Sequence, residues 1–292
     1  MLHASPSVDP STDPAEVRQE IVIQPRKGLR GLDLREIWQY RELLGFLVWR
    51  DVKVKYKMAM LGVAWAVLVP TIHAAIYSIF GLFMGMQDRV PDVPYPLWML
   101  AGVVPWLFIQ RSFNDGGLSL LNHQALLTKI YMPRLFIPAG SIGGALFDMG
   151  LMLGIFVLSA GIYAATSGYV PPIQILLVPV VLVLTVVAAF GTATLLSALI
   201  VLYRDLRFLI QFLSQFGLWL SGVAIPTSIF GKYEWVLAFN PYAGLISAWR
   251  WCLVGTDLNI PMLIGSCVGS PLLLLVGVLY FRRVERRFAD IA

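Results

Sequence analysis

The chain has 292 residues, of which 58% are hydrophobic and only 13% are charged, with a formal net charge of +5. Soluble domains are about 45–50% apolar and roughly 25% charged, so this chain has too few charged side chains to cover a water-facing surface. The composition excludes an ordinary soluble enzyme domain and predicts an all-α membrane protein with lipid as its main solvent.

The first 57 residues divide into a polar tail and an expected helix. Residues 1–32 are polar and proline-rich, so we expect a disordered cytoplasmic tail without a cleavable signal peptide. In residues 33–57, Asp33 can cap a helix, and apolar side chains recur at helical spacing with charges between them. We interpret this segment as an amphipathic helix in the cytoplasmic membrane interface. The alternative is the start of a long first span, against which the dense charges of residues 50–57 argue.

Residues 58–292 contain six apolar stretches that are long enough to cross a bilayer. A spanning helix needs about 20 residues, because a rise of about 1.5 Å per residue must cross about 30 Å of hydrocarbon. We therefore expect one transmembrane domain over residues 58–292, with both termini on the same side. The predicted spans are residues 58–87, 95–121, 135–165, 173–203, 208–231 and 260–281.

The positions of the basic residues predict the orientation of these spans. Eighteen of the 22 Lys and Arg residues lie in segments on the side of the termini, against three on the other side, namely Arg89, Lys232 and Arg250. The positive-inside rule therefore places both termini in the cytoplasm. The same distribution explains the net positive charge without a nucleic-acid partner.

The segment between the fifth and sixth spans, residues 232–259, is here called the outer segment. It is aromatic and has few charges, yet Asn240-Pro241 and Gly244 interrupt it as a possible span. We interpret it as two short re-entrant helices, since non-helical backbone at membrane depth must pack against protein or line a cavity. The alternative is an ordinary interfacial aromatic belt.

Three ionisable residues fall within the predicted spans, where a charge is costly and normally faces protein or water. Arg111 and Asp115 are four residues apart, so they share a helix face and can pair. This pair is either structural or part of a hydrated passage. Asp148 has no charged neighbour in sequence, so any partner must come from another helix. Both a structural and a passage-lining role remain open for it.

The sequence lacks the residue patterns of nucleotide, metal or catalytic sites. Gly231-Lys232 is followed by Tyr233, and Pro226 stands where a phosphate-binding loop needs glycine. The two cysteines, Cys252 and Cys267, form no metal motif, and the three histidines are far apart in sequence. We therefore expect no enzyme activity, metal or cofactor in this chain, and any ATP and Mg to be bound by another chain.

The inner loop between the second and third spans, residues 126–134, is short, basic and partly apolar. A short helix here can dock into a cytoplasmic partner, while the simpler interpretation is a plain positive-inside loop. The residues by themselves do not decide between the two.

Four short motifs, in this order, give the chain a family resemblance. They are residues 49–57 followed by Leu61-Gly62 and Trp65, residues 129–134 before a long apolar span, residues 203–206, and Asn240-Pro241 with Arg250. In order and topology they resemble the ABC-2 type permeases that export polysaccharides, over about residues 33–287. The resemblance implies an ABC-2 type transmembrane domain that acts as a homodimer in the bacterial inner membrane. It also implies two copies of a cytoplasmic ABC ATPase and a lipid-linked polysaccharide substrate such as an O-antigen, a capsule or a related polymer, with the O-antigen type favoured.

The resemblance also assigns roles to particular residues. Coupling to the ATPase falls to Leu126, Lys129, Tyr131, Pro133, Arg134, Arg204 and Asp205. A periplasmic gate falls to Trp235, Phe239, Asn240, Pro241, Tyr242, Trp249 and Arg250. A polymer needs a continuous hydrated passage, and sugar rings stack on aromatic side chains. The candidates to line it are Trp98, Trp106, Phe108, Arg111, Phe113, Asp115, Asp148 and Trp219.

Three other functions are weighed against polysaccharide export. The first is an ABC-2 exporter of small lipids or drugs. The second is an ion-coupled secondary transporter, which predicts inverted repeats and broken helices around an ion site, and neither is clear here. The third is a membrane-embedded enzyme, which needs a cluster of histidine or acidic residues at one membrane face.

Overall fold

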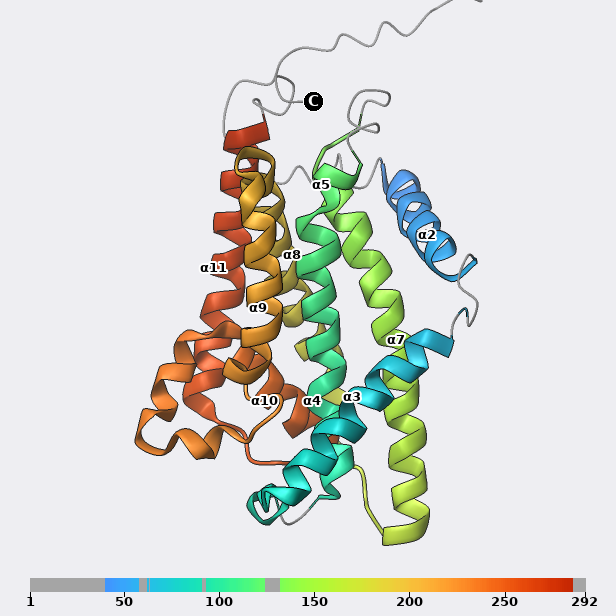
Figure 1. The fold of residues 1–292 in the computed structure, drawn as a ribbon, viewed down its shortest axis with the longest axis vertical. Helices are drawn as coiled ribbons and strands as arrows, with labels where there is room; N and C mark the ends of the chain where they lie inside the picture. The colour runs from blue at the N-terminus through green and yellow to red at the C-terminus, as the bar shows by residue number, and fades with distance from the viewer. Residues whose placement is uncertain (1–39, 58–61, 63, 91–92, 124–131, 286–292) are drawn as a thin grey trace, which may run out of the picture. The chain divides into compact units, whose positions relative to one another are not determined.

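The computed structural model describes residues 40–57, 62, 64–90, 93–123 and 132–285, and within these ranges the regular structure is helical, without strands (Figure 1). The long helices are α2 (Arg41–Lys57), α3 (Ala64–Phe83), α4 (Tyr95–Arg111), α7 (Phe136–Ser167), α8 (Val178–Leu202), α9 (Arg207–Leu220), α10 (Pro241–Val254) and α11 (Ile260–Val284). The short elements are η1 (Met86–Arg89), the π-helical turn η2 (Ser112–Gly116), α5 (Ser119–Asn122), η3 (Ile173–Leu177), η4 (Arg204–Leu206) and η5 (Thr227–Phe239).

Four helical stretches are long and apolar enough to cross a membrane: Ala64–Phe83, Phe136–Ser167, Ile173–Leu202 and Ile260–Val284. They confirm the first, third, fourth and sixth predicted spans as continuous apolar helices. The chain is therefore a multi-pass membrane protein.

The second and fifth predicted spans contain α-helices that are shorter than the predicted stretches. The second is the 17-residue α4, which continues through η2 into α5. The fifth is the 14-residue α9, which ends at Leu220 before Gly222 turns the chain with φ 70°. The number six for the spans thus remains a prediction.

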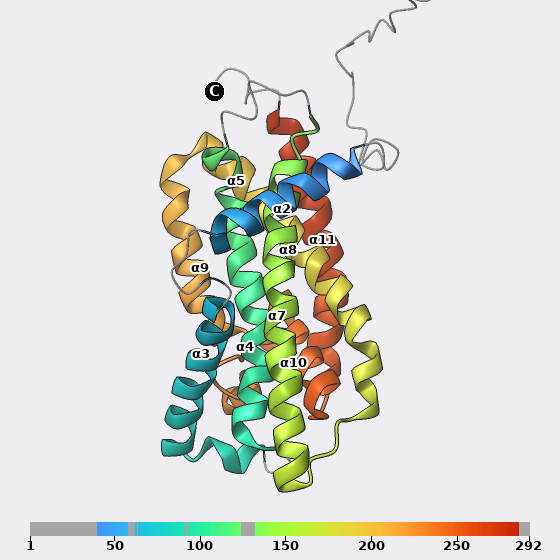
Figure 2. The ribbon, with the colours of Figure 1, turned by 90° about the vertical axis from the view of Figure 1, so that its right-hand side faces the viewer.

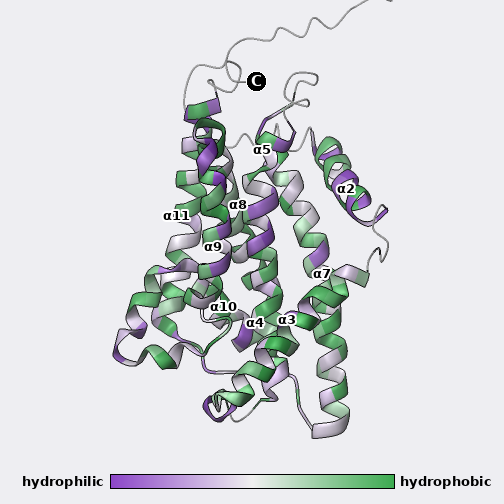
Figure 3. Ribbon diagram, in the orientation of Figure 1, coloured by the Kyte–Doolittle hydropathy of each residue, from purple (hydrophilic) through white to green (hydrophobic). Residues whose placement is uncertain are grey.

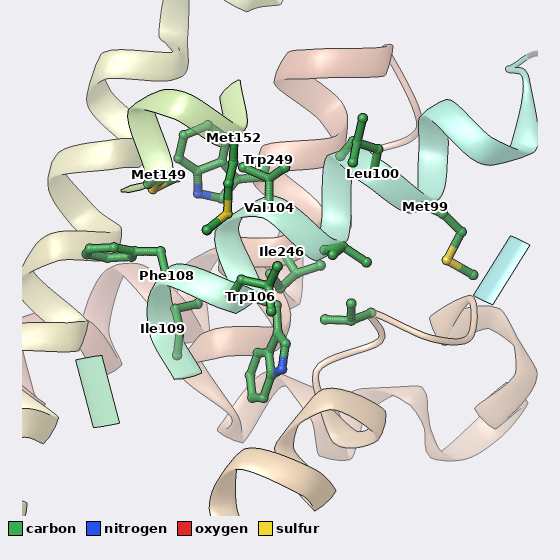
Figure 4. Packing of buried hydrophobic residues seen from close by; sticks show 14 of the residues in the cluster. Met99, Leu100, Val104, Trp106, Phe108, Ile109, Met149, Met152, Ile246 and Trp249 are labelled. Atoms are coloured by element: carbon green, nitrogen blue, oxygen red, sulfur yellow. The ribbon is translucent and has the colours of Figure 1, made fainter. Parts of the chain in front are cut away.

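Helix α4 lies at the centre of the packing, in contact with α3, α7 and α10. Nearly all of its side chains are buried, as expected for a helix that is apolar on every face. Figure 4 shows its residues Trp106 and Phe108 in the main core with Met149 of α7 and Trp249 of α10.

Glycines allow α8 and α11 to touch backbone to backbone. A methyl group added to Gly191 of α8 would overlap the backbone of Leu274 of α11, and one added to Gly277 would overlap the carbonyl of Gly191. Close approach of this kind drives helix association in lipid, where apolar side chains gain little by leaving the solvent.

Helix α2 packs along the first part of α7. The Tyr40 and Phe136 rings meet edge to face at 6.3 Å, and Leu47 lies on Gly140 of α7. Figure 2 shows α2 crossing in front of α7. Its other side exposes large apolar side chains, Phe46, Trp49 and Val54. The helix of the expected segment 33–57 is thus present over residues 41–57, and its placement in the membrane interface remains a prediction, as does the tail at residues 1–32, which lies outside the described residues.

The outer segment forms two short helical elements, most of η5 followed by α10. The side chain of Asn240 caps α10 by accepting a hydrogen bond from the Tyr242 backbone N–H at 3.1 Å. Gly265 and Gly269 of α11 give these elements room, because added methyl groups would press on Ala238 and Pro241. Whether the two elements enter the membrane as re-entrant helices remains a prediction.

Candidate functional site

Polar side chains from three helices meet at Asp148 of α7, a residue that is only 1% exposed. From α2, the Lys55 ammonium donates to Asp148 Oδ2 at 2.5 Å, and the Tyr56 hydroxyl donates to Oδ1. From α4, Arg111 forms an ion pair with the same carboxylate. Asp148 therefore has the partners from other helices that a lone buried acid requires.

Arg111 also holds Asp115, its predicted partner. The Arg111 Nε donates to Asp115 Oδ2 at 2.7 Å, which confirms the pairing expected from their spacing. Arg111 is the last residue of α4, and Asp115 lies within the π-helical turn η2 that follows, a local widening that is frequent at functional sites. Figure 3 shows hydrophilic bands in the upper part of the otherwise apolar helix that α4 and η2 form.

The local sequence explains how Lys55 reaches Asp148. Gly140, Gly143 and Gly144 of α7 provide a bed on which α2 lies, and a methyl group at Gly143 would overlap the Val48 side chain. Since α2 runs along this bed, its last turn arrives beside Asp148.

A cavity of about 770 Å³ opens beside this cluster. Its walls come from α2, α3, α4, η2, α5 and α7 and combine charged, amide and apolar side chains. Arg50 and Asp51, which pair at 2.8 Å, add a further cation and acid to its rim. The lining includes Gln110, Asn114, Asn122, His123, Trp65, Val69, Leu107 and Met152.

The charges in the cavity are balanced and partly desolvated. Partial burial and the Arg111 guanidinium lower the pKa of Lys55 from 10.5 to about 8, against an opposing effect of Asp115. Burial raises the pKa of Tyr56, so its phenol stays protonated and available as a donor. At neutral pH the cavity therefore offers ammonium, guanidinium, carboxylate and amide groups together.

The aromatic residues predicted to line a passage lie mostly in the interior of the chain. Trp98, Trp106, Phe108 and Phe113 are buried among its own side chains, whereas Trp219 is 43% exposed on α9. In this conformation the first four face neighbouring side chains. Their lining role remains a prediction.

The residues predicted to form a gate divide into two groups. Trp235 and Phe239 are exposed and meet edge to face at 6.1 Å. Asn240 and Pro241 begin α10, where the remaining three, Tyr242, Trp249 and Arg250, point into the protein. Their gating role remains a prediction.

Tyr242 and Trp249 both attach α10 to α8. The Tyr242 hydroxyl lies 2.5 Å from Thr192 Oγ1. The Trp249 indole N–H donates to Thr185 Oγ1 at 3.0 Å. Two hydrogen bonds between side chains therefore fix the position of α10 on α8.

Arg250 attaches α10 to the end of α9. Its Nη1 and Nη2 donate to the carbonyl oxygens of Gly222 and Val223, at 2.5 and 2.7 Å. These carbonyls follow the last turn of α9, so the cation lies at the negative end of that helix dipole. A polar cavity of about 680 Å³ lies beside Arg250, with Arg89, Tyr169, Glu234 and Asp257 in its walls.

The predicted coupling residues are described only in part. Leu126, Lys129 and Tyr131 lie outside the described residues. Pro133 and Arg134 precede α7, and the Arg134 guanidinium donates to the Glu285 carbonyl oxygen. Arg204 and Asp205 are exposed in η4. Figure 1 shows η4, between α8 and α9, at the same end of the bundle as α5 and the end of α11.

Lys55 and Tyr56 belong to the site, although neither was predicted from the sequence. Lys55 counted there only as one of the charges that keep residues 50–57 out of hydrocarbon. The signal that could have found it is Asp148 itself, because a lone acid within a span requires a cation from elsewhere.

Comparisons with known proteins agree on one family. The sequence profile of the ABC-2 type transporter family matches residues 42–254. An O-antigen export system permease protein RfbA of Klebsiella pneumoniae is 27% identical over 257 residues, which cover 86% of this chain and 95% of that protein. The RfbA of Myxococcus xanthus is 27% identical over 220 residues, or 74% of this chain and 82% of its own length. The polysialic acid transport protein KpsM of Escherichia coli is 21% identical over 203 residues, or 69% of this chain and 77% of its own.

Proposed function

Since the chain belongs to the ABC-2 type transporter family, we propose that it is the membrane permease subunit of an ABC exporter that moves a lipid-linked polysaccharide, of O-antigen type, across the bacterial inner membrane. In this proposal the chain works as a homodimer with both termini in the cytoplasm. Two copies of a separate ATPase bind ATP and Mg and supply the energy.

One observation carries the substrate class. The relatives that align over 86% of this chain are named as O-antigen export permeases. Relatives named for the transport of polysialic acid, another polysaccharide, match at 21–22% identity. A polysaccharide is therefore the common cargo of the named relatives, and the O-antigen type has the stronger support.

The cavity beside Asp148 suits a carbohydrate. Sugar hydroxyls both donate and accept hydrogen bonds, and the amides and carboxylates of the cavity wall can do the same. Trp65, also in the wall, offers a ring for a sugar face. The wall carries three cations and three acids beside its apolar side chains, and this supports a cargo with hydrogen-bonding groups over a purely apolar drug.

The coupling segments support a cytoplasmic partner. Pro133 and Arg134, the described part of the inner loop, precede α7 at the end of the bundle where η4 exposes Arg204 and Asp205. An ATPase docked at this end would contact both connections.

Deletion of the gene tests the proposal in cells. We expect surface O-antigen to disappear, lipid-linked polymer to accumulate on the cytoplasmic side, and a plasmid copy of the gene to restore the surface polymer. Deletion of the partner ATPase should give the same phenotype. A deletion strain with normal surface glycan would rule out polysaccharide export, and a change confined to small lipids would favour the alternative ABC-2 exporter.

A further inference from the structure

Asp148 is the one point at which polar groups from α2 and α4 meet on α7 within the described residues. We propose that Lys55, Tyr56, Arg111 and Asp148, here called the α2–α7 clamp, make α2 and the first half of α7 move as one body and pass that movement to α4. Asp148 is then a positioning residue for transport. The inference rests on the proposed function, because it describes how motion started by the ATPase reaches the middle of the membrane domain.

The contacts between α2 and α7 extend far enough to form a single body. The first contact joins the rings of Tyr40 and Phe136, and the last joins Lys55 to Asp148. Twelve residues of α7 separate these two points, a rise of about 18 Å. Between them, Leu47 and Val48 of α2 lie directly on Gly140 and Gly143 of α7. A displacement of α2 along its axis must therefore carry this part of α7 with it.

The charges of the clamp explain why it connects α2 to α4 as well. A buried carboxylate is stable only if cations and hydrogen-bond donors surround it. Asp148 obtains one cation from Lys55 and the other from Arg111, and Arg111 in turn holds Asp115. Since α2 otherwise packs chiefly on α7, this shared carboxylate is the polar connection through which α2 acts on α4.

The same arrangement makes the clamp testable without unfolding the protein. If Lys55 loses its charge, Arg111 still neutralises Asp148, so no buried charge is left alone. A Lys55→Met variant should therefore insert and fold, while the connection between α2 and the other two helices is weakened.

The first test measures transport and ATP hydrolysis together, in proteoliposomes that hold the complete complex with its ATPase. We expect Lys55→Met to lower the amount of lipid-linked glycan moved per ATP hydrolysed at least fivefold. Lys55→Arg, which keeps the cation, should recover most of the loss. Lys53→Met is the matched control, because Lys53 is an exposed lysine on the same helix, and it should behave as wild type.

A normal ratio of glycan to ATP in Lys55→Met would overturn the clamp. That outcome differs from failure of the proposed function, in which the wild-type complex itself would move no lipid-linked glycan.

The second test locks α2 to α7. In Asp51→Cys with Gly144→Cys the Cβ atoms would lie 3.8 Å apart, which is close to the mean of about 3.8 Å in disulfides. Leu47→Cys with Gly140→Cys, at 3.2 Å, is a second lock that changes no charge. Because the two helices move as one body, the oxidised complexes should transport as well as the reduced ones and as the single-cysteine variants.

Two results of the locking experiment would overturn the proposal. One is transport that stops on oxidation and returns on reduction, since α2 would then slide on α7. The other is a failure of both cysteine pairs to form a disulfide in the folded complex, since α2 would then not lie on the glycine bed.

Discussion

The guanidinium carbon of Arg250 in α10 lies 3.4 Å from the centroid of the Trp98 ring in α4. Together with the hydrogen bonds to Gly222 and Val223, this contact joins α10, α4 and the end of α9 through one side chain. The Tyr95 ring in turn stacks on the Trp98 ring, with 5.5 Å between the ring centroids. The position of the predicted gate helix therefore depends on a buried cation that is held by carbonyl oxygens and aromatic rings.

Replacement of Arg250 should destabilise the packing of α10 against α4 and the end of α9. Arg250→Met removes the stacked cation and leaves two buried carbonyls without donors, which should cost about 3 kcal/mol or more of folding free energy. Arg250→Lys should recover only part, because an ammonium cannot reproduce the planar fork. The melting temperature of the purified protein in detergent measures the effect, with exposed Arg89→Gln as control. Equal melting temperatures for Arg250→Met and wild type would show that this contact is not stabilising.

Glycines at close helix contacts should differ sharply from glycines in open positions. Gly191→Ala should prevent normal packing of α8 on α11, because the added methyl group would overlap the Leu274 backbone, which cannot change rotamer as a side chain can. Gly154→Ala has nothing within 4 Å of the added carbon and should be neutral, or stabilising by up to about 1 kcal/mol through helix propensity. Expression yield and elution as a single species from a sizing column would report the difference. Similar behaviour of the two variants would contradict the observed α8–α11 packing.

The hydrogen bond between Tyr242 and Thr192 should contribute measurably to the attachment of α10. Tyr242→Phe and Thr192→Val should each cost about 1 kcal/mol. In the double variant the loss should be smaller than the sum, because both changes remove the same bond. Unfolding of the wild type, the two single variants and the double variant in detergent mixtures gives the four free energies of this double-mutant cycle. Strictly additive losses would mean that the two hydroxyl groups act independently.

Alkaline pH should weaken the α2–α7 clamp. The pKa of Lys55 is lowered to about 8, so its ammonium is mostly present at pH 7, half lost near pH 8 and mostly lost by pH 9. Because the unfolded chain keeps this proton up to its higher pKa, the contribution of Lys55 to the unfolding free energy rises with pH in this window, while the ion pair with Asp148 disappears.

Glycan moved per ATP should therefore fall as the pH is raised from 7 to 9, with a midpoint near 8. Lys55→Arg should shift this fall to higher pH, since a guanidinium remains charged. The ratio to ATP hydrolysis in the same proteoliposomes corrects for the pH response of the ATPase. Identical pH profiles for Lys55→Arg and wild type would assign the titration to another group.

The sequence allowed four long helices to be predicted because hydropathy is a local property. The ends at Phe136 and Ile260 were predicted within one residue, since each apolar run begins beside polar or charged residues. The fifth predicted span, residues 208–231, contains no charge, yet α9 ends at Leu220. Arg250, which holds the carbonyls beyond that end, is distant in sequence, so no local pattern could reveal it.

In the candidate site, too, the local contacts could be predicted from the sequence and the distant ones could not. Arg111 and Asp115 are four residues apart on one helix, so their pairing follows from helical geometry. Two of the partners of Asp148, Tyr56 and Lys55, lie 92 and 93 residues earlier in the chain, and only the packing of α2 on α7 brings them to it. The spacing Gly150/Gly154, which has the pattern of a packing motif, meets nothing within 4 Å, whereas Gly143 carries the close contact with α2.

ATP-dependent movement of the polymer in a purified system tests the central proposal most directly. The measurement is the amount of lipid-linked O-antigen polysaccharide that becomes accessible on the far side of proteoliposomes containing this permease and its partner ATPase. We predict transfer that needs both proteins and ATP and is absent with either protein alone. An assembled complex that hydrolyses ATP while the polysaccharide stays on its original side would contradict the proposal.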